Sequence, residues 1–417
     1  MQGYRCSIGV RAIFTVTLLV TSSWAGEKVL HNFGLSNTDG QTPVASLVMD
    51  SAGNLYGTTM IGGSKNVGTV FETSPNGSGG WTSAVLYSFG QTGTDGQNPE
   101  AGLIFDSAGN LYGTTYAGGS ASGGTVFELS PNGSGGWTER VLHNFGISTG
   151  DGQNPQAGLV ADSAGNLYGT TANGGTQSEG TVFEMSPNGS GGYTEKVLHH
   201  FFLTTDDGEN PEAGLIFDGA GNLYGTTFAG GSAGHGTVFE LVANGSGGFT
   251  EKVLHNFFVH GDANDGSNPQ AALVFDTAGN LYGTTKTGGS EFFGAGAVFE
   301  LTPSGPGAWS EKVLHTFAFS GPDGKNPESA LILDSAGNLY GTAYKGGTTD
   351  EGIVFKMTPN GSGGWTESVI HNFQVVSGNN DGANPQGGLI FDTAGNLYGT
   401  TDKGGNHSAG AVFEVTP

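Results

Sequence analysis

Cysteine is almost absent from this sequence, whose 417 residues include only Cys6. One cysteine can form no disulfide within the chain and cannot build a cysteine-ligated metal site. Cys6 also precedes an apolar run instead of following it, so it does not match a lipid-attachment cysteine. We therefore expect packing and hydrogen bonds to stabilise the fold without covalent cross-links.

Charged residues are scarce, and positive charges are the scarcest. Asp, Glu, Lys and Arg make up 12% of the chain, about half the share in an average protein. The sequence has 13 Lys and Arg against 37 Asp and Glu, which gives a formal net charge of −24. A field of this sign repels phosphate backbones and anionic lipid surfaces. We expect no nucleic-acid partner, whereas divalent cations and neutral ligands such as sugars remain candidates.

Long apolar runs are missing after the N-terminal 25 residues. In that first segment a basic region with Arg5 and Arg11 precedes the apolar stretch 12–20 and the small-residue site that ends at Ala25. This pattern predicts a signal peptide, residues 1–25, cleaved after Ala25. A retained membrane anchor is the alternative, but the apolar stretch is short for a membrane span. We expect the mature chain, residues 26–417, to be exported and to contain no transmembrane segment.

Glycine, in contrast, is abundant: 79 residues are Gly, and they fall at fixed places between short runs of Val, Leu, Phe, Tyr and Thr. This arrangement is typical of turn-rich all-β chains. The phrase "AGNLYGTT" at 52–59 also recurs, with small changes, six more times. Its tyrosines are spaced by 56 or 58 residues: Tyr56, Tyr112, Tyr168, Tyr224, Tyr282, Tyr340 and Tyr398. The chain is therefore built from seven repeats of 56–58 residues.

One repeat shows what each unit contains. Apolar runs at 103–105, 111–115, 125–129 and 137–145 are separated by "DSAGN", a Gly/Ser loop and "SPNGSGG", each of which is a turn signal. Four antiparallel strands with no helical periodicity between them are the content of a propeller blade. The sequence thus predicts an all-β, seven-bladed β-propeller with four-stranded blades.

The two ends of the chain complete one another. "EKVLHNF" at 27–33 corresponds to a fourth strand without its first three, and "GAVFEVTP" at 410–417 ends with a third strand without a fourth. We predict that the strand at 29–33 pairs with that at 411–415 and closes the ring. Closure would hide the sheet edges that otherwise promote association, so we expect residues 26–417 to form one domain and a monomer.

The unit "DGQNPEAGLIFDSAGNLYGTTYAGGSASGGTVFELSPNGSGG" resembles the GloVer (Gloeo-Verruco type) tandem repeat of exported bacterial proteins, and the resemblance covers the chain after Ala25. It implies a secreted, periplasmic or cell-surface location. It implies no activity, because the family has no assigned function and supplies no catalytic residues to transfer. Members often carry a C-terminal surface-anchoring segment, a pattern from which this sequence departs by ending at Thr416 and Pro417.

Most of the repeated residues have a structural explanation. In "DSAGNLYGTT" we expect Gly53 to adopt a positive φ, Asn54 to bond the local backbone, and Leu55 and Tyr56 to pack on opposite blade faces. "NGS" at Asn76 and its equivalents matches a glycosylation acceptor, but Asn-Gly is also the strongest hairpin signal. A histidine recurs on the outer strand, and equivalent positions in a ring lie too far apart to share an ion. These histidines are His31, His143, His199, His255, His315 and His371, with Tyr87 in the remaining repeat.

An Asp-Gly pair recurs in the segment between blades, before Asn-Pro. Calcium favours carboxylate-rich loops with glycine turns, so a calcium site is a candidate. The alternative is a plain turn in which Asp bonds backbone amides, and the spacing of a calcium-binding loop is not met even in "DANDGSN" at 262–268. The aspartates are Asp39, Asp95, Asp151, Asp207, Asp265, Asp323 and Asp381.

Differences between the repeats are the strongest functional signal. The residue after Asn-Pro alternates through repeats two to seven as Glu100, Gln156, Glu212, Gln270, Glu328 and Gln386, and in repeat one it is Val44. Aromatic residues after "GTT" or "GTA" accompany each Glu: Tyr116, Phe228 and Tyr344. Duplication of an ancestral two-repeat unit would explain this pattern. Three ligand sites, each with a stacking ring and a hydrogen-bond acceptor for a sugar, would explain it equally well.

These features favour a multivalent binding module for extracellular carbohydrate or another cell-surface component. The alternative is a propeller enzyme of the hydrolase, lactonase or lyase type with a cation in its channel, because three carboxylates around a channel could hold a metal or exchange protons. We find no nucleophile, base and orienting group placed together in one repeat. A purely structural surface protein is the third interpretation.

Overall fold

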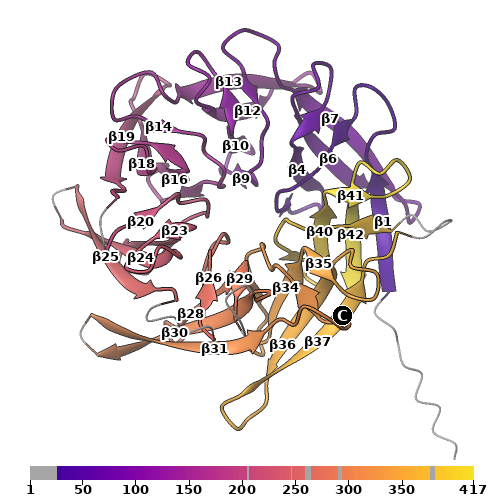
Figure 1. The fold of residues 1–417 in the computed structure, drawn as a ribbon. Helices are drawn as coiled ribbons and strands as arrows, with labels where there is room; N and C mark the ends of the chain where they lie inside the picture. The colour runs from indigo at the N-terminus through magenta and orange to yellow at the C-terminus, as the bar shows by residue number, and fades with distance from the viewer. Residues whose placement is uncertain are drawn as a thin grey trace, which may run out of the picture.

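The computed structural model describes residues 26–203, 206–245, 247–258, 264–289, 294–305, 307–375 and 381–417. The predicted signal peptide lies outside these ranges. Within them the secondary structure consists of strands and turns, and seven four-stranded sheets stand around a central axis (Figure 1). The described residues form no helix long and apolar enough to cross a membrane. The predicted seven-bladed β-propeller is confirmed.

Each blade runs from an inner strand near the axis to an outer strand at the rim. The inner strands are β3 (Val48–Met49), β9 (Ile104–Phe105), β15 (Val160–Ala161), β21 (Ile216–Phe217), β27 (Val274–Phe275), β33 (Ile332–Leu333) and β39 (Ile390–Phe391). The second strands are β4 (Leu55–Thr59), β10 (Leu111–Thr115), β16 (Leu167–Thr171), β22 (Leu223–Thr227), β28 (Leu281–Thr285), β34 (Leu339–Ala343) and β40 (Leu397–Thr401). The third strands are β6 (Thr69–Pro75), β12 (Thr125–Pro131), β18 (Thr181–Pro187), β24 (Thr237–Ala243), β30 (Ala297–Gly305), β36 (Ile353–Pro359) and β42 (Ala411–Thr416). The outer strands are β7 (Trp81–Ser88), β13 (Trp137–Asn144), β19 (Tyr193–His200), β25 (Phe249–Asn256), β31 (Ala308–Thr316), β37 (Trp365–Asn372) and β1 (Gly26–Asn32).

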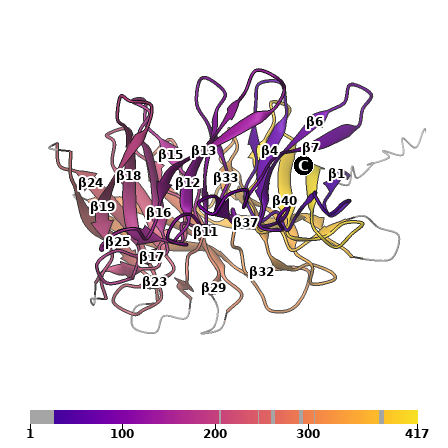
Figure 2. The same ribbon diagram turned by 90° about the horizontal axis from the view of Figure 1, so that it is seen from above.

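Short two-stranded ladders supplement the blades, because each Asp-Gly segment pairs with the residues after "GTT" of its own repeat. The ladders are β2 (Gly40–Gln41) with β5 (Ile61–Gly62), β8 (Gly96–Gln97) with β11 (Ala117–Gly118), β14 (Gly152–Gln153) with β17 (Asn173–Gly174), β20 (Gly208–Glu209) with β23 (Ala229–Gly230), β26 (Gly266–Ser267) with β29 (Thr287–Gly288), β32 (Gly324–Lys325) with β35 (Lys345–Gly346), and β38 (Gly382–Ala383) with β41 (Lys403–Gly404). Figure 2 shows the ladders on one face of the ring and the hairpins between third and outer strands on the other.

The ring closes as predicted. Strand β1 pairs antiparallel with β42, from Gly26 opposite Thr416 to Asn32 opposite Ala411, with one irregularity between Val29 and His31. The seventh blade therefore contains both ends of the described chain, and its strand order is the same as in the other six.

The repeated turn is built around an aspartate. Gly53 has a φ of 84°, which only glycine adopts at little cost. The Asp50 carboxylate accepts hydrogen bonds from the amides of Ala52 and Asn54, from the Asn54 side chain at 2.8 Å, and from the Tyr56 hydroxyl at 3.3 Å. The prediction that the Asn54 side chain bonds the local backbone is therefore wrong. The side-chain amide of Asn54 donates to the Asp50 carboxylate instead.

The apolar core lies between the blades. Leu55 packs in a cluster with Tyr398 of the preceding blade, whereas Tyr56 packs with Leu103 and Leu111 of the following one. The prediction that the leucine and the tyrosine of the repeated phrase occupy opposite faces is confirmed. Each junction between two blades buries one such leucine from one blade and one such tyrosine from the other. Hydrogen bonds add to this packing, since Thr58 donates to the carbonyl of Ala101 in the next blade at 2.9 Å.

Candidate functional site

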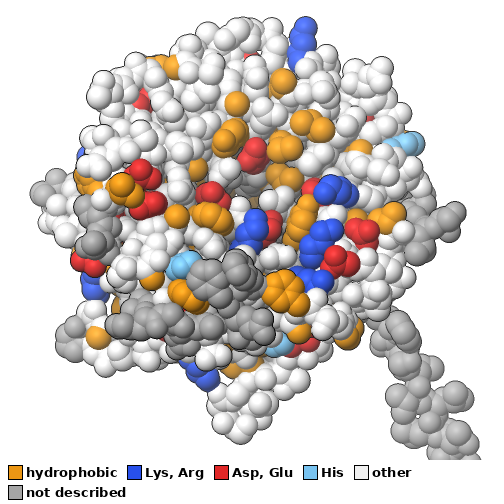
Figure 3. All heavy atoms as spheres, in the orientation of Figure 1, with side chains coloured by type: hydrophobic (Ala, Val, Ile, Leu, Met, Phe, Trp, Pro, Cys, Tyr) orange, Lys and Arg blue, Asp and Glu red, His pale blue; other side chains and the backbone are white. Residues whose placement is uncertain are grey.

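The inner strands surround a central cavity of about 290 Å³. It is narrow because small residues lie where the strands converge: a side chain at Gly102 would meet the carbonyl oxygen of Ser46 at 3.1 Å. Figure 3 shows the face that carries the ladders, on which acidic and basic side chains gather around the hollow centre. Every residue of the Glu/Gln alternation lines this cavity, as does Val44: Glu100, Gln156, Glu212, Gln270, Glu328 and Gln386.

The three glutamates have different electrostatic environments. Burial, with a contribution from the Glu212 charge, raises the pKa of Glu100 to about 7, although a hydrogen bond from Gln156 opposes the shift. Burial also raises the pKa of Glu212, and the charge of Lys286 opposes that shift. Glu328 forms an ion pair with Lys286 at 3.0 Å, and its side chain is only 6% exposed.

Lys286 therefore places a positive charge beside the glutamates of the cavity. The ammonium of Lys286 also donates to the side-chain oxygen of Gln270 at 3.3 Å. The cavity therefore offers a carboxylate at Glu328 that is paired with the Lys286 ammonium and a buried carboxyl group of raised pKa at Glu100. Between them the amides of the glutamines supply both donors and acceptors.

The aromatic residues that accompany each Glu lie elsewhere. Tyr116, Phe228 and Tyr344 are half-buried, and none of them lines the cavity. The backbone of Tyr116 is held on both sides, because its amide donates to Asn98 of its own repeat and its carbonyl accepts from Asn154 of the next. The structure thus brings the glutamates together in one cavity and does not add the aromatic rings to it.

A second charged group adjoins Tyr344. The hydroxyl of Tyr344 donates to the Asp402 carboxylate at 3.2 Å and accepts from the ammonium of Lys403 at 3.2 Å. Burial raises the pKa of Asp402 to about 6, although the charge of Lys403 opposes the shift. Lys286 and Asp402 were not among the site residues predicted from the sequence. One sequence signal could have identified them: both are charged residues at a position that is aromatic in alternate repeats.

The aspartates of the Asp-Gly segments lie at the rim, where each contacts the outer strand of the preceding blade. Asp151 accepts the amide of Ile147 at 3.1 Å and contacts Nε2 of His143 at 3.3 Å. In the repeat with tyrosine, the hydroxyl of Tyr87 donates to Asp95 at 2.9 Å. The calcium hypothesis requires several oxygens around one ion, and each of these aspartates belongs to a different junction. Asp207, Asp265, Asp323 and Asp381 make the corresponding contacts to His199, His255, His315 and His371. Asp262 lies outside the described residues.

Comparison with known proteins gives one family and several structures. The Gloeobacter/Verrucomicrobia repeat family matches residues 11–215 and 190–413, whereas no curated protein matches the chain. The extracellular domain of a candidate hybrid two-component system protein from B. thetaiotaomicron is similar with a TM-score of 0.54 and 13% identity, over 93% of this chain and 40% of that one. A candidate 6-phosphogluconolactonase from Bacteroides uniformis is similar with a TM-score of 0.50 and 15% identity, over 86% and 89% of the two chains. At these identities the likeness extends to the fold alone.

Proposed function

This chain belongs to the Gloeobacter/Verrucomicrobia repeat family, and we propose that it is an exported binding protein that takes one sugar residue of an extracellular carbohydrate into its central cavity. The observation that carries the proposal is the convergence of three carboxyl and three amide side chains on one cavity. Sugar hydroxyls both donate and accept hydrogen bonds, so carboxylates and amides are suitable partners for them.

The size of the cavity supports a small ligand. Its volume of about 290 Å³ is just below the range of small-molecule pockets, which is about 300–1,000 Å³. A single sugar ring, or the end of a longer glycan, is the part that such a cavity can enclose. The side-chain oxygen of Gln156 is buried and has no hydrogen-bond partner among the described residues, so a ligand hydroxyl would satisfy an acceptor that the protein leaves open.

A glycan array followed by calorimetry tests the proposal. We expect one ligand per chain, because the six side chains share one cavity. The double variant Glu100→Gln, Glu212→Gln should weaken binding about tenfold or more, since hydrogen bonds to charged groups contribute about 1.5–3 kcal/mol. Glu72→Gln, on the third strand of a blade, is the matched control. Failure to bind any glycan, or equal affinity in the double variant, would reject the cavity as a sugar site.

A hydrolase is the second candidate function, favoured by the pKa of about 7 at Glu100 beside Glu212. A carboxyl group whose pKa lies near the working pH can act as a general acid or base. Assays of lactone and glycoside hydrolysis test this candidate. Turnover that Glu100→Gln abolishes while binding persists would assign the cavity to an enzyme.

A further inference from the structure

Two junctions between blades bring together three groups of metal-ligand type at the rim of the ring. At the first, His143 on β13, Asp151 on the following loop and Glu195 on β19 each place one donor atom within 4.8 Å of the other two. Glu195 belongs to the next blade, so the cluster forms only when the two blades pack. Its carboxylate contributes no ligand to the proposed sugar cavity, which lies at the axis.

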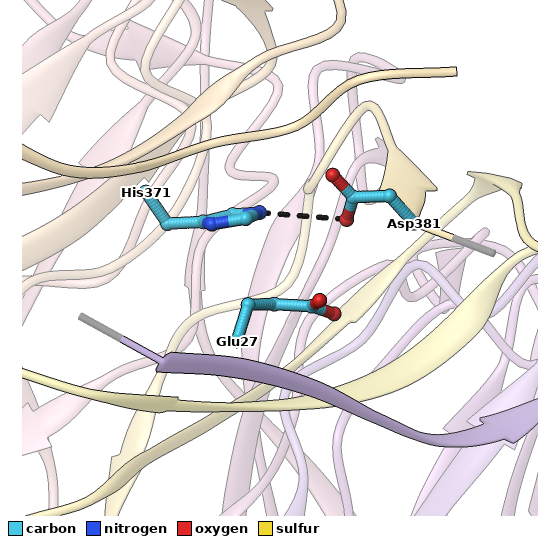
Figure 4. A group of neighbouring side chains, drawn as sticks. All are labelled: Glu27, His371 and Asp381. Atoms are coloured by element: carbon cyan, nitrogen blue, oxygen red, sulfur yellow. Dashed lines mark hydrogen bonds and ion pairs between the residues drawn. The ribbon is translucent and has the colours of Figure 1, made fainter. Parts of the chain in front are cut away.

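The second junction is the one at which β1 completes the ring. Figure 4 shows Glu27 of β1 beneath His371 of β37 and Asp381, with the contact of 3.4 Å between Nε2 of His371 and the Asp381 carboxylate. The donor atoms of these three residues also lie within 4.8 Å of one another. In the part of the chain that the structure describes, the same three residue types come this close at two junctions, with the His and the Glu on outer strands of successive blades in each case. Three further junctions hold the same residue types outside this distance: Glu251 with His199 and Asp207, Glu311 with His255 and Asp265, and Glu367 with His315 and Asp323.

The glutamates of both clusters are incompletely satisfied. Oε1 of Glu27 and Oε1 of Glu195 are buried and have no hydrogen-bond partner among the described residues. Each lies near a second carboxylate, and the Asp151 side chain is only 2% exposed. Two carboxylates this close repel one another, and the repulsion is relieved by a proton on one of them or by a positive charge between them. An orphaned carboxylate oxygen beside an imidazole nitrogen is thus a place for a cation.

The donor set selects the class of cation. One imidazole nitrogen and two carboxylate oxygens suit zinc and related divalent transition metals, which commonly take three protein ligands and a water. Calcium requires six to eight oxygen ligands, more than either cluster provides. We propose that the clusters His143–Asp151–Glu195 and Glu27–His371–Asp381 bind a divalent transition-metal ion such as zinc, which links neighbouring blades at the rim.

The protein contains its own incomplete versions of the site. At the junction of the first two blades Tyr87 replaces the histidine, beside Asp95 and Glu139. At the junction of the seventh and first blades Ser83 lies where the glutamate would be, in a surface pocket with His31 and Asp39. Both blade junctions pack without the full donor set, which shows that substitutions of these kinds are compatible with the fold.

Zinc binding by the full chain, stripped of metal with a chelator and titrated with zinc by calorimetry, tests the proposal. We expect the double variant Glu27→Ser, Glu195→Ser, which copies the Ser83 junction, to bind two zinc ions fewer than the parent chain. The control variant Glu139→Ser, at the tyrosine junction, should lose none. Calcium at the same concentration should not displace the bound zinc.

A second measurement guards against misfolding of the double variant. The single variant His143→Tyr copies the Tyr87 junction and should bind one zinc ion fewer than the parent chain. In crystals of the parent chain, anomalous scattering at the zinc edge should place an ion at each of the two clusters. An unchanged zinc stoichiometry in the glutamate variant, no zinc binding by the parent chain, or displacement of the zinc by calcium would overturn the proposal.

Discussion

The hydroxyl of Thr400 donates a hydrogen bond of 2.8 Å to the carbonyl of Ala45, although the two residues lie 355 positions apart in sequence. The bond joins the last blade to the first, and each other junction has its equivalent. The remaining six run from Thr58 to Ala101, Thr114 to Ala157, Thr170 to Ala213, Thr226 to Ala271, Thr284 to Ser329 and Thr342 to Gly387. The junction where the ring closes is therefore built from the same contact as the junctions within the continuous chain.

The first prediction is that this bond contributes equally at the closing junction and inside the chain. Thr400→Val and Thr170→Val each remove a buried donor and leave a buried carbonyl unsatisfied, which costs about 1–3 kcal/mol. Denaturant unfolding should give similar losses for the two variants. A much larger loss in Thr400→Val would contradict the prediction and show that the bond contributes more at the closing junction than inside the chain.

The second prediction concerns β1. A chain that starts at residue 35 lacks the outer strand of the seventh blade and exposes the edge of β42, so it should aggregate or lose much of its thermal stability. A chain that starts at residue 26 keeps β1 and is the control. Gel filtration and thermal melting compare them, and equal melting of the two chains would contradict closure by β1.

The third prediction is a pH dependence with a definite sign. Burial, reinforced by the Asp95 charge, raises the pKa of Glu139 to about 7 from its ordinary value of 4.5. A group whose pKa is higher in the folded protein contributes stability that is full below pH 4.5 and is lost as the pH rises through 7. With chelator present, the melting temperature should therefore be higher at pH 5 than at pH 8.

Glu139→Gln removes this titration and serves as its test. The variant should lose less melting temperature between pH 5 and pH 8 than the parent chain does. Identical pH profiles for the two proteins would show that Glu139 is not buried as described.

The fourth prediction concerns tight packing within a blade. A methyl group at Gly113 would lie 2.7 Å from the ring of Phe127 and 2.8 Å from Leu103, so Gly113→Ala should destabilise the fold by about 1–3 kcal/mol. Gly93 has open space around it, and Gly93→Ala should be close to neutral. Unfolding free energies decide between the two, and equal values would contradict the packing.

The fifth prediction separates one sugar site from three. The triple variant Tyr116→Ala, Phe228→Ala, Tyr344→Ala should keep most of its affinity for a glycan, because these rings do not line the cavity. Calorimetry should still give one ligand per chain. A loss of binding in this variant, with three ligands per parent chain, would instead support three separate platforms on the ladder face.

The fold could be predicted from the sequence because its signals are local and repeated. Gly53 and its equivalents mark every inner hairpin, and the split blade at the two ends shows how the ring closes. The candidate site was harder to predict because the Asp-Gly-x-Asn-Pro segment runs from the rim to the axis. The sequence placed the glutamates around a channel, as the cavity lining shows for Glu100. Sequence spacing did not reveal that Asp95, five residues earlier, stays at the rim against Tyr87 of the outer strand.

The rim clusters had no signal within one repeat. Glu195 lies in "YTEKVLH" between Thr194 and Lys196, and an acidic residue between two polar ones resembles an ordinary surface position of a strand. Its meeting with His143 depends on the packing of two blades, which no local pattern encodes. The recurrent histidines lie too far apart to bind a metal ion together, but His143 and His371 each meet carboxylates of neighbouring elements.

The number of blades has a consequence for the alternation around the cavity. Two kinds of residue cannot alternate around a ring with an odd number of members, so two neighbours of the same kind must meet or one position must differ. Val44 occupies that position, between Gln386 and Glu100. The ring of Glu and Gln side chains in the cavity is therefore interrupted at one position, and this mismatch removes the rotational equivalence of the blades. A ligand in the cavity would be oriented by it, with its least polar edge toward Val44.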